Sequence, residues 1–294
     1  MTTPLFARVA IVGFGLIGSS IARCVVEYPG LAGAVTCVDR AQAVCDRVLE
    51  LGLADKAGTD PALVSECDLV VLATPIGAFA DLGALIGPHL REGTILTDVG
   101  SVKMSVIRDI GPHVPDGVHF IPGHPLAGTE HSGPDSGFAA LFKGRWCILT
   151  PLPGTNPEAL DRLTAFWAGC GSQMEVMEPA HHDRVLAITS HLPHLIAYTI
   201  VGTATDLEEQ MKSEVIRFSA SGFRDFTRIA ASDPVMWRDI FLNNREAVLE
   251  VIQRFTEDLT ALQRAIRWGE GEKLESLFTR TRAIRRSIID AKQA

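Results

Sequence analysis

The sequence predicts an α/β fold in which a doubly wound, mostly parallel sheet is followed by an all-helical domain. Short apolar runs alternate with helical patterns through the first half of the chain, as they do in parallel sheets. The first run, residues 9–12, leads directly into a glycine-rich turn, and no convincing strand follows Pro179. We therefore expect a first domain at residues 1–177 and a second at 178–294.

Strands are expected wherever a short apolar run is bounded by turn residues. The runs lie at residues 9–12, 34–39, 67–73, 94–98, 120–122, 146–150 and 174–177. Helical patterns at 41–51 and 77–87 separate the early strands. Ligands of a doubly wound sheet bind beyond the carboxyl ends of its strands, and Thr74, Ser101 and His124 fall just past such ends.

The glycine-rich turn has the G-x-G-x-x-G spacing of a Rossmann dinucleotide-binding domain. Gly13 permits the tight turn, Gly15 lets the backbone approach a pyrophosphate, and Gly18 lets the helix pack against the strand. Leu16 and Ile17 lie in the same turn, where the helix N-terminus offers free N–H groups to phosphates. The alternative is a strand–turn–helix whose glycines serve packing alone.

An acid stands where a dinucleotide-binding domain needs one. Asp39 closes the strand at 34–39, about 20 residues beyond Gly18, and a carboxylate there accepts hydrogen bonds from the adenosine ribose. It would repel a 2′-phosphate, so NAD is favoured over NADP, although the adjacent Arg40 could partly offset that repulsion. Thr74, beyond a neighbouring strand, is a further candidate contact to the cofactor.

Composition bounds the function classes. The 294 residues are 47% hydrophobic and 21% charged, which suits a soluble globular protein of two domains. The net charge of −8 argues against nucleic-acid or anionic-membrane partners, and no uninterrupted apolar run reaches membrane-spanning length. Six cysteines without a C-x-x-C pair are expected as buried thiols in a reducing cytosol, so we expect a cytoplasmic protein.

The second half is expected to be helical. Pro179 suits the first turn of a helix that runs to about residue 206. Asp233 followed by Pro234 marks a second helix start, with a capping side chain ahead of proline.

A heptad-like seam follows that second start. Its apolar residues are Val248, Ile252, Phe255, Leu259, Leu262 and Ile266. Gly269 and Gly271 end the seam, and a last helix is expected at about 272–292. Such a seam favours a homodimer through the C-terminal helices, the alternative being an intramolecular bundle.

Two residues beyond strand ends suit redox chemistry. Ser101 would sit where a nicotinamide ring arrives, and it also suits a helix N-cap; the two roles can coexist. His124 is expected in a restricted loop between Gly123 and Pro125. Its neutral imidazole could accept a proton from a hydroxyl as hydride leaves the same carbon. Glu130 could close or orient the site, or be a solvated loop acid.

Histidines cluster again in the helical half. Residues 181–183 are His-His-Asp, and His191 and His194 are three apart, on roughly one helix face. Pro193 removes one backbone hydrogen bond and leaves the carbonyl of Thr189 unpaired, and a kink is tolerable where a side chain or ligand satisfies that carbonyl. Zinc binding is disfavoured, because no H-E-x-x-H, cysteine ligand or carboxylate at ligand spacing accompanies the pair. A satisfied core histidine remains an alternative for His191.

Further along, Arg228 has apolar neighbours and an acid, Asp225, three residues before it. A buried arginine needs a carboxylate partner. We expect Asp225 to pair with Arg228 while the remaining donors of the guanidinium face a substrate carboxylate. A purely structural ion pair is the alternative.

Taken in order, these segments resemble the prephenate/arogenate (cyclohexadienyl) dehydrogenases of tyrosine biosynthesis. The segments that carry the resemblance are residues 13–20, 98–103, 123–130, 190–194 and 225–230. The resemblance covers nearly the whole chain. It implies a Rossmann domain and an all-helical dimerisation domain with the active site in the cleft between them. It also implies oxidative decarboxylation of prephenate to 4-hydroxyphenylpyruvate, or of arogenate to tyrosine, with NAD reduced.

The resemblance also implies roles for individual residues. His124 would accept the proton of the substrate hydroxyl, and Ser101 would bridge His124, that hydroxyl and the nicotinamide. Arg228, oriented by Asp225, would bind the ring carboxylate.

At the other end of the substrate, the resemblance implies that His194 recognises the side chain, with Trp237 nearby. The further substrate-binding residues implied are His191, Thr129 and Glu130.

Two other functions are consistent with parts of the sequence. A β-hydroxyacid or imine reductase shares the two-domain plan but more naturally uses a catalytic lysine, and the segments at 190–194 and Arg228 count against it. An NAD-binding sensor would not need His124. The sequence leaves open the choice between prephenate and arogenate, tyrosine feedback, and any NADP use that Arg40 permits.

Overall fold

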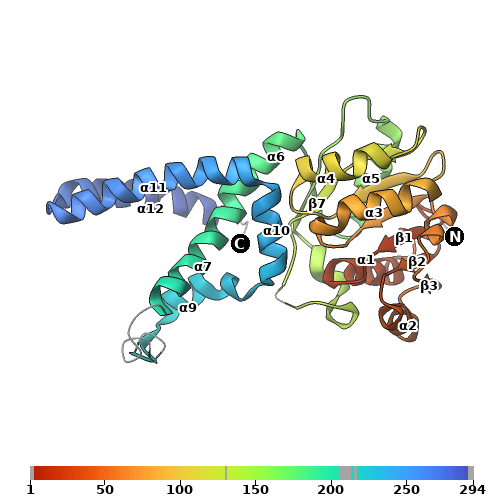
Figure 1. Ribbon diagram of the computed structural model, residues 1–294, viewed down its shortest axis with the longest axis horizontal. Coiled ribbons are helices and arrows are strands. Elements are labelled where there is room, and N and C mark those ends of the chain that lie inside the picture. The colour runs from red at the N-terminus through yellow and green to blue at the C-terminus, as the bar shows by residue number, and fades with distance from the viewer. Residues whose placement is uncertain (1–2, 130, 206–212, 215–216, 291–294) are drawn as a thin grey trace. The chain divides into compact units, whose positions relative to one another are not determined.

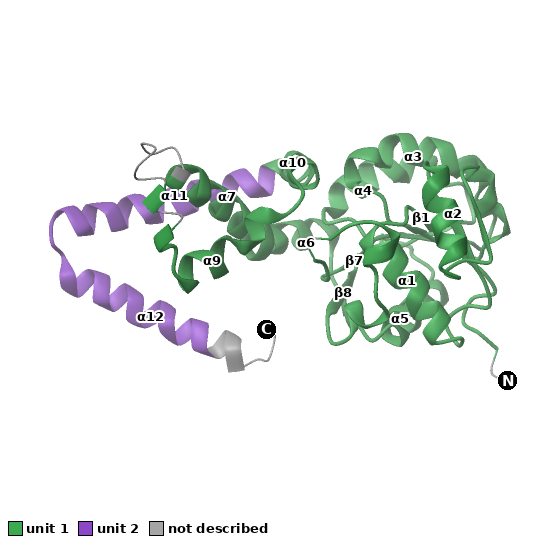
Figure 2. Ribbon diagram, turned by 90° about the horizontal axis from the view of Figure 1, so that it is seen from below, with its two compact units in different colours: residues 1–245 green, residues 246–294 purple. Residues whose placement is uncertain are grey.

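The structure is a computed structural model that describes residues 3–129, 131–205, 213–214 and 217–290. The chain divides into two compact units, residues 1–245 and 246–294 (Figure 2). The first contains the sheets and the helices that pack against them, and the second contains the C-terminal helices. The division expected near residue 178, where strands give way to helices, stays a prediction.

The central sheet has six parallel strands in the order β3-β2-β1-β4-β5-β6. They are β1 (Val9–Val12), β2 (Val35–Val38), β3 (Lys56–Gly58), β4 (Leu69–Leu72), β5 (Ile95–Asp98) and β6 (His119–Phe120). β1 is central, and its Val9 aligns with Val35 on one side and Leu69 on the other. The strand order reverses beside β1, which places the ligand-binding edge at the carboxyl ends of β1, β4 and β5. The three-residue β3 was not predicted.

Both faces of this sheet are buried, which explains why its strands are continuous apolar runs rather than alternating ones. Val9 and Ile11 point into one core with α1 (Leu16–Glu27), α2 (Gln42–Glu50) and α5 (Pro157–Gly169). The other core, which contains Ala10 and Val12, includes α3 (Phe79–Ile86) and α4 (Lys103–Ile110) (Figure 1). This doubly wound arrangement confirms the predicted fold class.

A second, three-stranded sheet corrects the sequence-based expectation. It contains β7 (Gly123–Pro125), β8 (Trp146–Leu149) and β9 (Gln173–Val176). β8 and β9 are parallel, but β7 runs antiparallel to β8, with His124 opposite Ile148. His124 was expected in a loop. It lies instead in the strand β7. That strand was not predicted, because three residues ending in proline are too few to show the period-two pattern of a strand.

The helical part of the first unit comprises α6 (Pro179–Leu186), a π-helical turn at Ala187–His191, α7 (Leu192–Thr205), α9 (Ser221–Thr227) and α10 (Pro234–Asn243). The predicted starts are confirmed, since the side chain of Glu178 caps α6 and that of Asp233 caps α10. The π-helical turn ends at His191, two residues before Pro193. It accommodates the proline, whose missing N–H would break a regular α-helical ladder.

The helical stretch Pro179–Ala204 is long and apolar enough to cross a membrane, by length and composition alone. Its most apolar 18-residue window has a mean hydropathy of 1.4. The sequence-based expectation did not include it, because the stretch contains histidines and no uninterrupted apolar run. Its buried polar residues His182, Asp183 and His191 are hydrogen-bonded within the protein.

The C-terminal helices are α11 (Arg245–Arg267) and α12 (Gly271–Asp290). The seam was expected to continue from the helix that starts at Pro234. Asn244, with φ −105° and ψ 32°, instead separates α10 from α11. Gly269, with φ +66°, lies between α11 and α12 and confirms the predicted end of the seam. Within the seam, Leu259 and Ile266 are 53% and 67% exposed.

Candidate functional site

A buried ion pair at the end of β5 holds the two predicted catalytic segments. Asp98 Oδ2 accepts the N–H of Gly100 at 2.7 Å, and its Oδ1 accepts the N–H of Gly123 at 3.1 Å. Lys103 Nζ donates to Asp98 and to the carbonyl of Gly123. Burial raises the pKa of Asp98 and lowers that of Lys103, and their mutual attraction opposes both shifts. The pair thereby fixes the backbone just before Ser101 and just before His124.

His124 is 8% exposed and contacts a second imidazole. Its Nδ1 lies 2.9 Å from Nε2 of His182, whose Nδ1 lies 2.8 Å from Oδ1 of Asp183. Burial is the main cause that lowers the pKa of His124 well below 6.5, and the neighbouring imidazole of His182 and the positive charge of Lys103 add to it. The imidazole is therefore neutral at pH 7, which is the form that accepts a proton.

Asp183 also caps the helix that follows Ser101. Its Oδ1 accepts the N–H of Lys103 at 2.7 Å, and its Oδ2 accepts that of Met104 at 2.9 Å. The sequence suggested Ser101 for this cap. That suggestion is wrong, because α4 begins two residues later and its free N–H groups point to the carboxylate from α6. Ser101 is half-buried in the preceding turn, so its hydroxyl has no capping role there.

His191 is oriented by an asparagine that the sequence did not point to. Asn244 Nδ2 donates to the carbonyl of Asp183 at 2.8 Å and lies 3.1 Å from Nδ1 of His191. Because an amide NH₂ only donates, Nδ1 of His191 accepts, and its proton is on Nε2. That Nε2 is buried and has no partner among the described residues. Burial lowers the pKa of His191 to about 4, so the ring is neutral.

Trp237 and His194 form a stacked pair beside His191. Their ring centroids are 3.6 Å apart with an interplanar angle of 23°, and Nδ1 of His194 donates to the Ser190 carbonyl at 2.9 Å. The buried indole N–H of Trp237 has no partner in the described part of the chain. Its ring centroid lies 6.1 Å from that of His191. The two rings therefore bring two unsatisfied N–H donors to one region.

Arg228 lies near this group but is not placed as expected. It is exposed, as is Asp225, and no ion pair joins these two described residues. The expected pairing rested on Arg228 being buried, and this part of the prediction is wrong. The positive charge of Arg228 nevertheless contributes to lowering the pKa of His194, after burial, so the guanidinium lies close enough to act on the same region.

The glycine-rich turn fits a dinucleotide. Gly13 has φ +93°, and a Cβ at Gly18 would overlap the carbonyl oxygen of Gly13. A Cβ at Gly15 would meet nothing within 4 Å, so the backbone is open to a phosphate there. Asp39 Oδ2 accepts the N–H of Phe14 at 3.0 Å, which ties the acid to this turn. Each carboxylate oxygen of Asp39 accepts one N–H, leaving lone pairs for ribose hydroxyls.

The other predicted cofactor contacts surround the same turn. Leu16 and Ile17 form the first turn of α1, and Arg40 is exposed beside Asp39. The hydroxyl of Thr74 is buried and has no partner among the described residues, while its methyl group lies against Gly13.

Of the two loop residues, Thr129 is exposed and its hydroxyl accepts the N–H of His131 at 3.3 Å. Glu130 lies outside the described residues.

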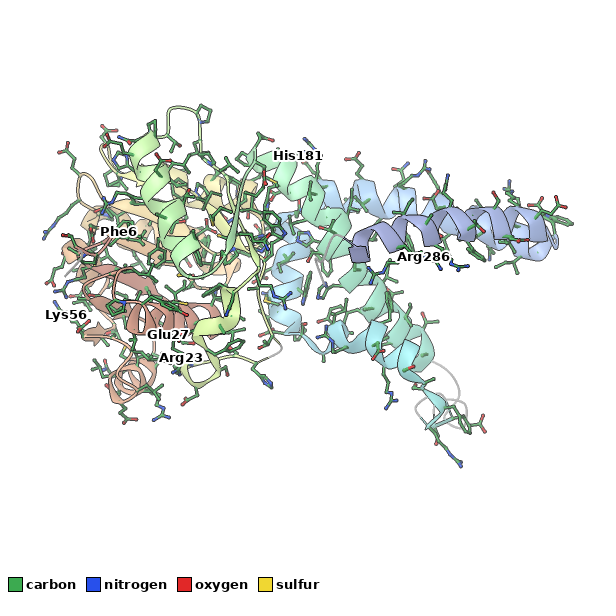
Figure 3. The ribbon with its side chains drawn as sticks, turned by 180° about the vertical axis from the view of Figure 1, so that it is seen from behind. Phe6, Arg23, Glu27, Lys56, His181 and Arg286 are labelled. Atoms are coloured by element: carbon green, nitrogen blue, oxygen red, sulfur yellow. The ribbon has the colours of Figure 1, made fainter. Side chains whose placement is uncertain are left out.

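Sequence reasoning missed part of the polar network. It noted the pair His182 and Asp183 without a role, although the two residues differ sharply from His181, which is exposed at the start of α6 (Figure 3). It gave no signal for Asn244. The adjacent histidine and aspartate near a predicted helix start were visible in the sequence, but their burial and their contact with His124 were not. Among the described residues, no three histidine, cysteine or acidic side chains are grouped as metal ligands.

Comparison with known families gives two matches. Residues 22–176 match the sequence model described as "Prephenate dehydrogenase, nucleotide-binding domain". Residues 178–280 match "Prephenate dehydrogenase, dimerization domain". The first match begins within α1, after the glycine-rich turn.

Individual relatives agree along nearly the full length. The chain is 41% identical over 286 residues to the cyclohexadienyl dehydrogenase of Zymomonas mobilis, covering 97% of each chain. It is similar to the crystal structure of Aquifex aeolicus prephenate dehydrogenase in complex with hydroxyphenyl propionate and NAD⁺, with a TM-score of 0.88, 34% identity and coverage of 98% and 99%. For Synechocystis arogenate dehydrogenase the TM-score is 0.82, with 29% identity and coverage of 96% and 99%.

Proposed function

Because this chain belongs to the prephenate dehydrogenase family, we propose that His124 is the general base of an NAD-dependent oxidative decarboxylation. The reaction converts prephenate to 4-hydroxyphenylpyruvate, or L-arogenate to L-tyrosine, in tyrosine biosynthesis. The observation that carries the assignment of the base is a buried, neutral imidazole at the ligand-binding edge of the sheet, held through Nδ1 by His182. Its Nε2 is then the atom that meets the substrate hydroxyl.

The glycine-rich turn and Asp39 would hold NAD⁺, which would supply the acceptor for the hydride that leaves the ring carbon bearing the hydroxyl. His124 takes the hydroxyl proton in the same step. When the ring carboxylate leaves as CO₂, its bonding electrons pass to the ring oxygen and the ring becomes aromatic. The protonated His124 can return its proton to that oxygen, so the reaction as a whole takes up no proton. Ser101, which follows the Gly100 backbone held by Asp98, would hydrogen-bond the same hydroxyl.

The substrate is an anion, and the chain carries a net charge of −8, so local groups must hold it. We assign this task to Arg228 and to the two unsatisfied donors, Nε2–H of His191 and Nε1–H of Trp237. An unpaired buried donor costs about 1–3 kcal/mol, which a bound carboxylate or carbonyl would recover. His194, stacked on Trp237, is assigned to the side-chain end of the substrate. Thr129 and Glu130, which follow His124 in the segment 123–130, remain proposed contacts to the substrate.

Two further assignments complete the proposal. The dimerisation described for the family fits the seam on α11, where exposed Leu259 and Ile266 leave apolar surface for a second copy of the chain. A cytoplasmic location fits the cysteines, all six of which are buried free thiols.

Initial rates test the function directly. Formation of reduced cofactor is followed by absorbance with prephenate and with L-arogenate, each in the presence of NAD⁺ or NADP⁺. We expect turnover of at least one substrate with NAD⁺ preferred, because Asp39 repels a 2′-phosphate. Similar rates on both substrates would make this a broad cyclohexadienyl dehydrogenase. A lack of turnover on either substrate would refute the proposal.

A further inference from the structure

We propose that His182 and Asp183 form a relay that fixes the protons of two imidazoles and leaves Nε2 of His124 as a bare lone pair. This inference rests on the proposed function, because it explains how His124 is prepared to act as a base. His182 and Asp183 act as positioning residues in it. They come from α6, whereas His124 comes from β7, so the relay joins segments 58 positions apart.

The direction of the relay is set at Asp183. A backbone N–H can only donate, and those of Lys103 and Met104 point at the two carboxylate oxygens at 2.7 and 2.9 Å. Both oxygens of Asp183 thus act as acceptors, and the Nδ1 of His182, 2.8 Å from Oδ1, carries the proton of that contact.

The next link follows from the neutrality of His182. The ring is 0% exposed, and burial lowers its pKa, although Asp183 opposes that shift. With its one proton on Nδ1, His182 presents the lone pair of Nε2. The nitrogen 2.9 Å away is Nδ1 of His124, which must then donate. The single proton of neutral His124 is thus on Nδ1, and Nε2 is free to accept.

Without the relay, the proton of His124 could lie on either nitrogen. The tautomer with Nε2–H cannot accept a proton from a substrate hydroxyl, so every molecule in that state would be inactive. An aspartate that sets the tautomer of a catalytic histidine has a large effect in serine proteases, where loss of its charge lowers kcat by about 10⁴-fold.

His182 gives a cleaner test than Asp183, because Asp183 also caps α4. His182→Gln and His182→Met have side chains of matched length. In the first, Oε1 takes the place of Nε2 and accepts from Nδ1 of His124. In the second, a thioether offers only a weak acceptor. The charged and titratable groups facing His182 from α4, β5 and the π-helical turn, Lys103, Asp98 and His191, are unchanged in both variants.

We expect His182→Gln to stay within about tenfold of the unmodified enzyme in kcat and His182→Met to lose about 100-fold, the lower end of what a general base contributes. In both variants the KM for the organic substrate and the Kd for NAD⁺ should equal those of the unmodified enzyme. The two variants should also have the same melting temperature as each other. Equal losses in the two variants, or no loss in either, would overturn the proposal.

A spectroscopic measurement tests the proton arrangement without substrate. In protein labelled with ¹⁵N-histidine, the ring nitrogens that carry a proton are distinguished by their shifts, and the His124→Asn variant identifies which of the nine histidines is His124. We expect Nδ1–H in the unmodified protein and in His182→Gln, and a population with Nε2–H in His182→Met. Nε2–H in the unmodified protein would overturn the relay.

The two readouts separate this inference from the proposed function. If the unmodified protein turns over neither prephenate nor arogenate, the function fails, and the ¹⁵N shifts still decide whether the relay exists. If it turns over substrate but its His124 carries Nε2–H, the relay alone fails.

Discussion

The carboxylate of Asp183 caps the helix that begins at Lys103, accepting its backbone N–H at 2.7 Å across 80 positions of the sequence. The same carboxylate holds His182, and through it His124. One side chain from the helical segment thus holds both His124, the proposed base, and the start of the helix that follows Ser101. This contact brings residues from both halves of the chain into one polar network.

Asp183→Asn should weaken both functions of this side chain. One of its two acceptor oxygens becomes an NH₂ group that faces a backbone N–H or the proton of His182. We expect the unfolding free energy to fall by about 1–2 kcal/mol, the range for a lost cap, and kcat to fall with it. Urea unfolding and initial rates measure the two effects. Asp60→Asn is the matched control, since Asp60 caps a short helix through Ala62 and contacts no histidine.

If Asp183→Asn loses stability as predicted but keeps full kcat, the cap is real and the aspartate does not orient the imidazoles.

Asn244→Asp should reverse the proton position on His191. An aspartate offers an acceptor to Nδ1, so the proton moves there, and Nε2 ceases to be a donor. We expect the KM for the organic substrate to rise about tenfold, the equivalent of one lost buried hydrogen bond, with a smaller change in kcat. Asn243→Asp is the control, because Asn243 contacts Arg108 and the Asp239 carbonyl instead. An unchanged KM in Asn244→Asp would remove His191 from the substrate site.

Asp39→Asn should relax the choice of cofactor. The amide still accepts from Phe14 through one oxygen, but the negative charge that repels a 2′-phosphate is gone. We expect a weaker Kd for NAD⁺ and a stronger one for NADP⁺, measured by fluorescence titration. Combining the change with Arg40→Ala should cancel the gain for NADP⁺, because Arg40 is the adjacent exposed cation. An unaltered ratio of the two Kd values would show that Asp39 does not face the ribose.

Stability should fall as the pH drops below 6.5, because buried neutral histidines take up protons only on unfolding. The folded pKa of His191 is about 4 and that of His124 is well below 6.5, so both contribute full stability above pH 6.5 and lose it as the pH falls. Below pH 6.5 each lowers the unfolding free energy by about 1.4 kcal/mol per pH unit, and above it by almost nothing. We therefore expect the two together to cost about 3 kcal/mol between pH 7.5 and 5.5.

Urea unfolding at the two pH values measures this loss, and His124→Asn isolates one histidine. The variant should lose about 1.4 kcal/mol less than the unmodified protein over the same interval. An equal loss in both would mean that His124 is not held neutral in the folded state.

The sequence predicted the strands of the central sheet and the helix starts well, because these depend on local patterns. Residues 9–12 form β1, and the caps before Pro179 and Pro234 form as expected. It missed the strands β3 and β7, which are three residues long and too short to show a period.

The site was less predictable, since its residues act through contacts between distant segments. His124 and Ser101 were proposed from their expected place beyond strand ends, which stays a prediction, but the cap assigned to Ser101 comes from Asp183. Neither the contact of His182 with His124 nor that of Asn244 with His191 leaves a pattern in the sequence. The expected pairing of Asp225 with Arg228 failed because helical spacing does not reveal that both side chains are exposed.

The base assigned to His124 is tested most directly by a single measurement on His124→Asn. Reduction of NAD⁺ by prephenate or L-arogenate is followed under single-turnover conditions, with the Kd for NAD⁺ measured on the same preparation. We predict that the rate falls by at least about 100-fold, as expected for loss of a general base, while the Kd is unchanged. A variant that binds NAD⁺ and reduces it at the rate of the unmodified enzyme would contradict the account.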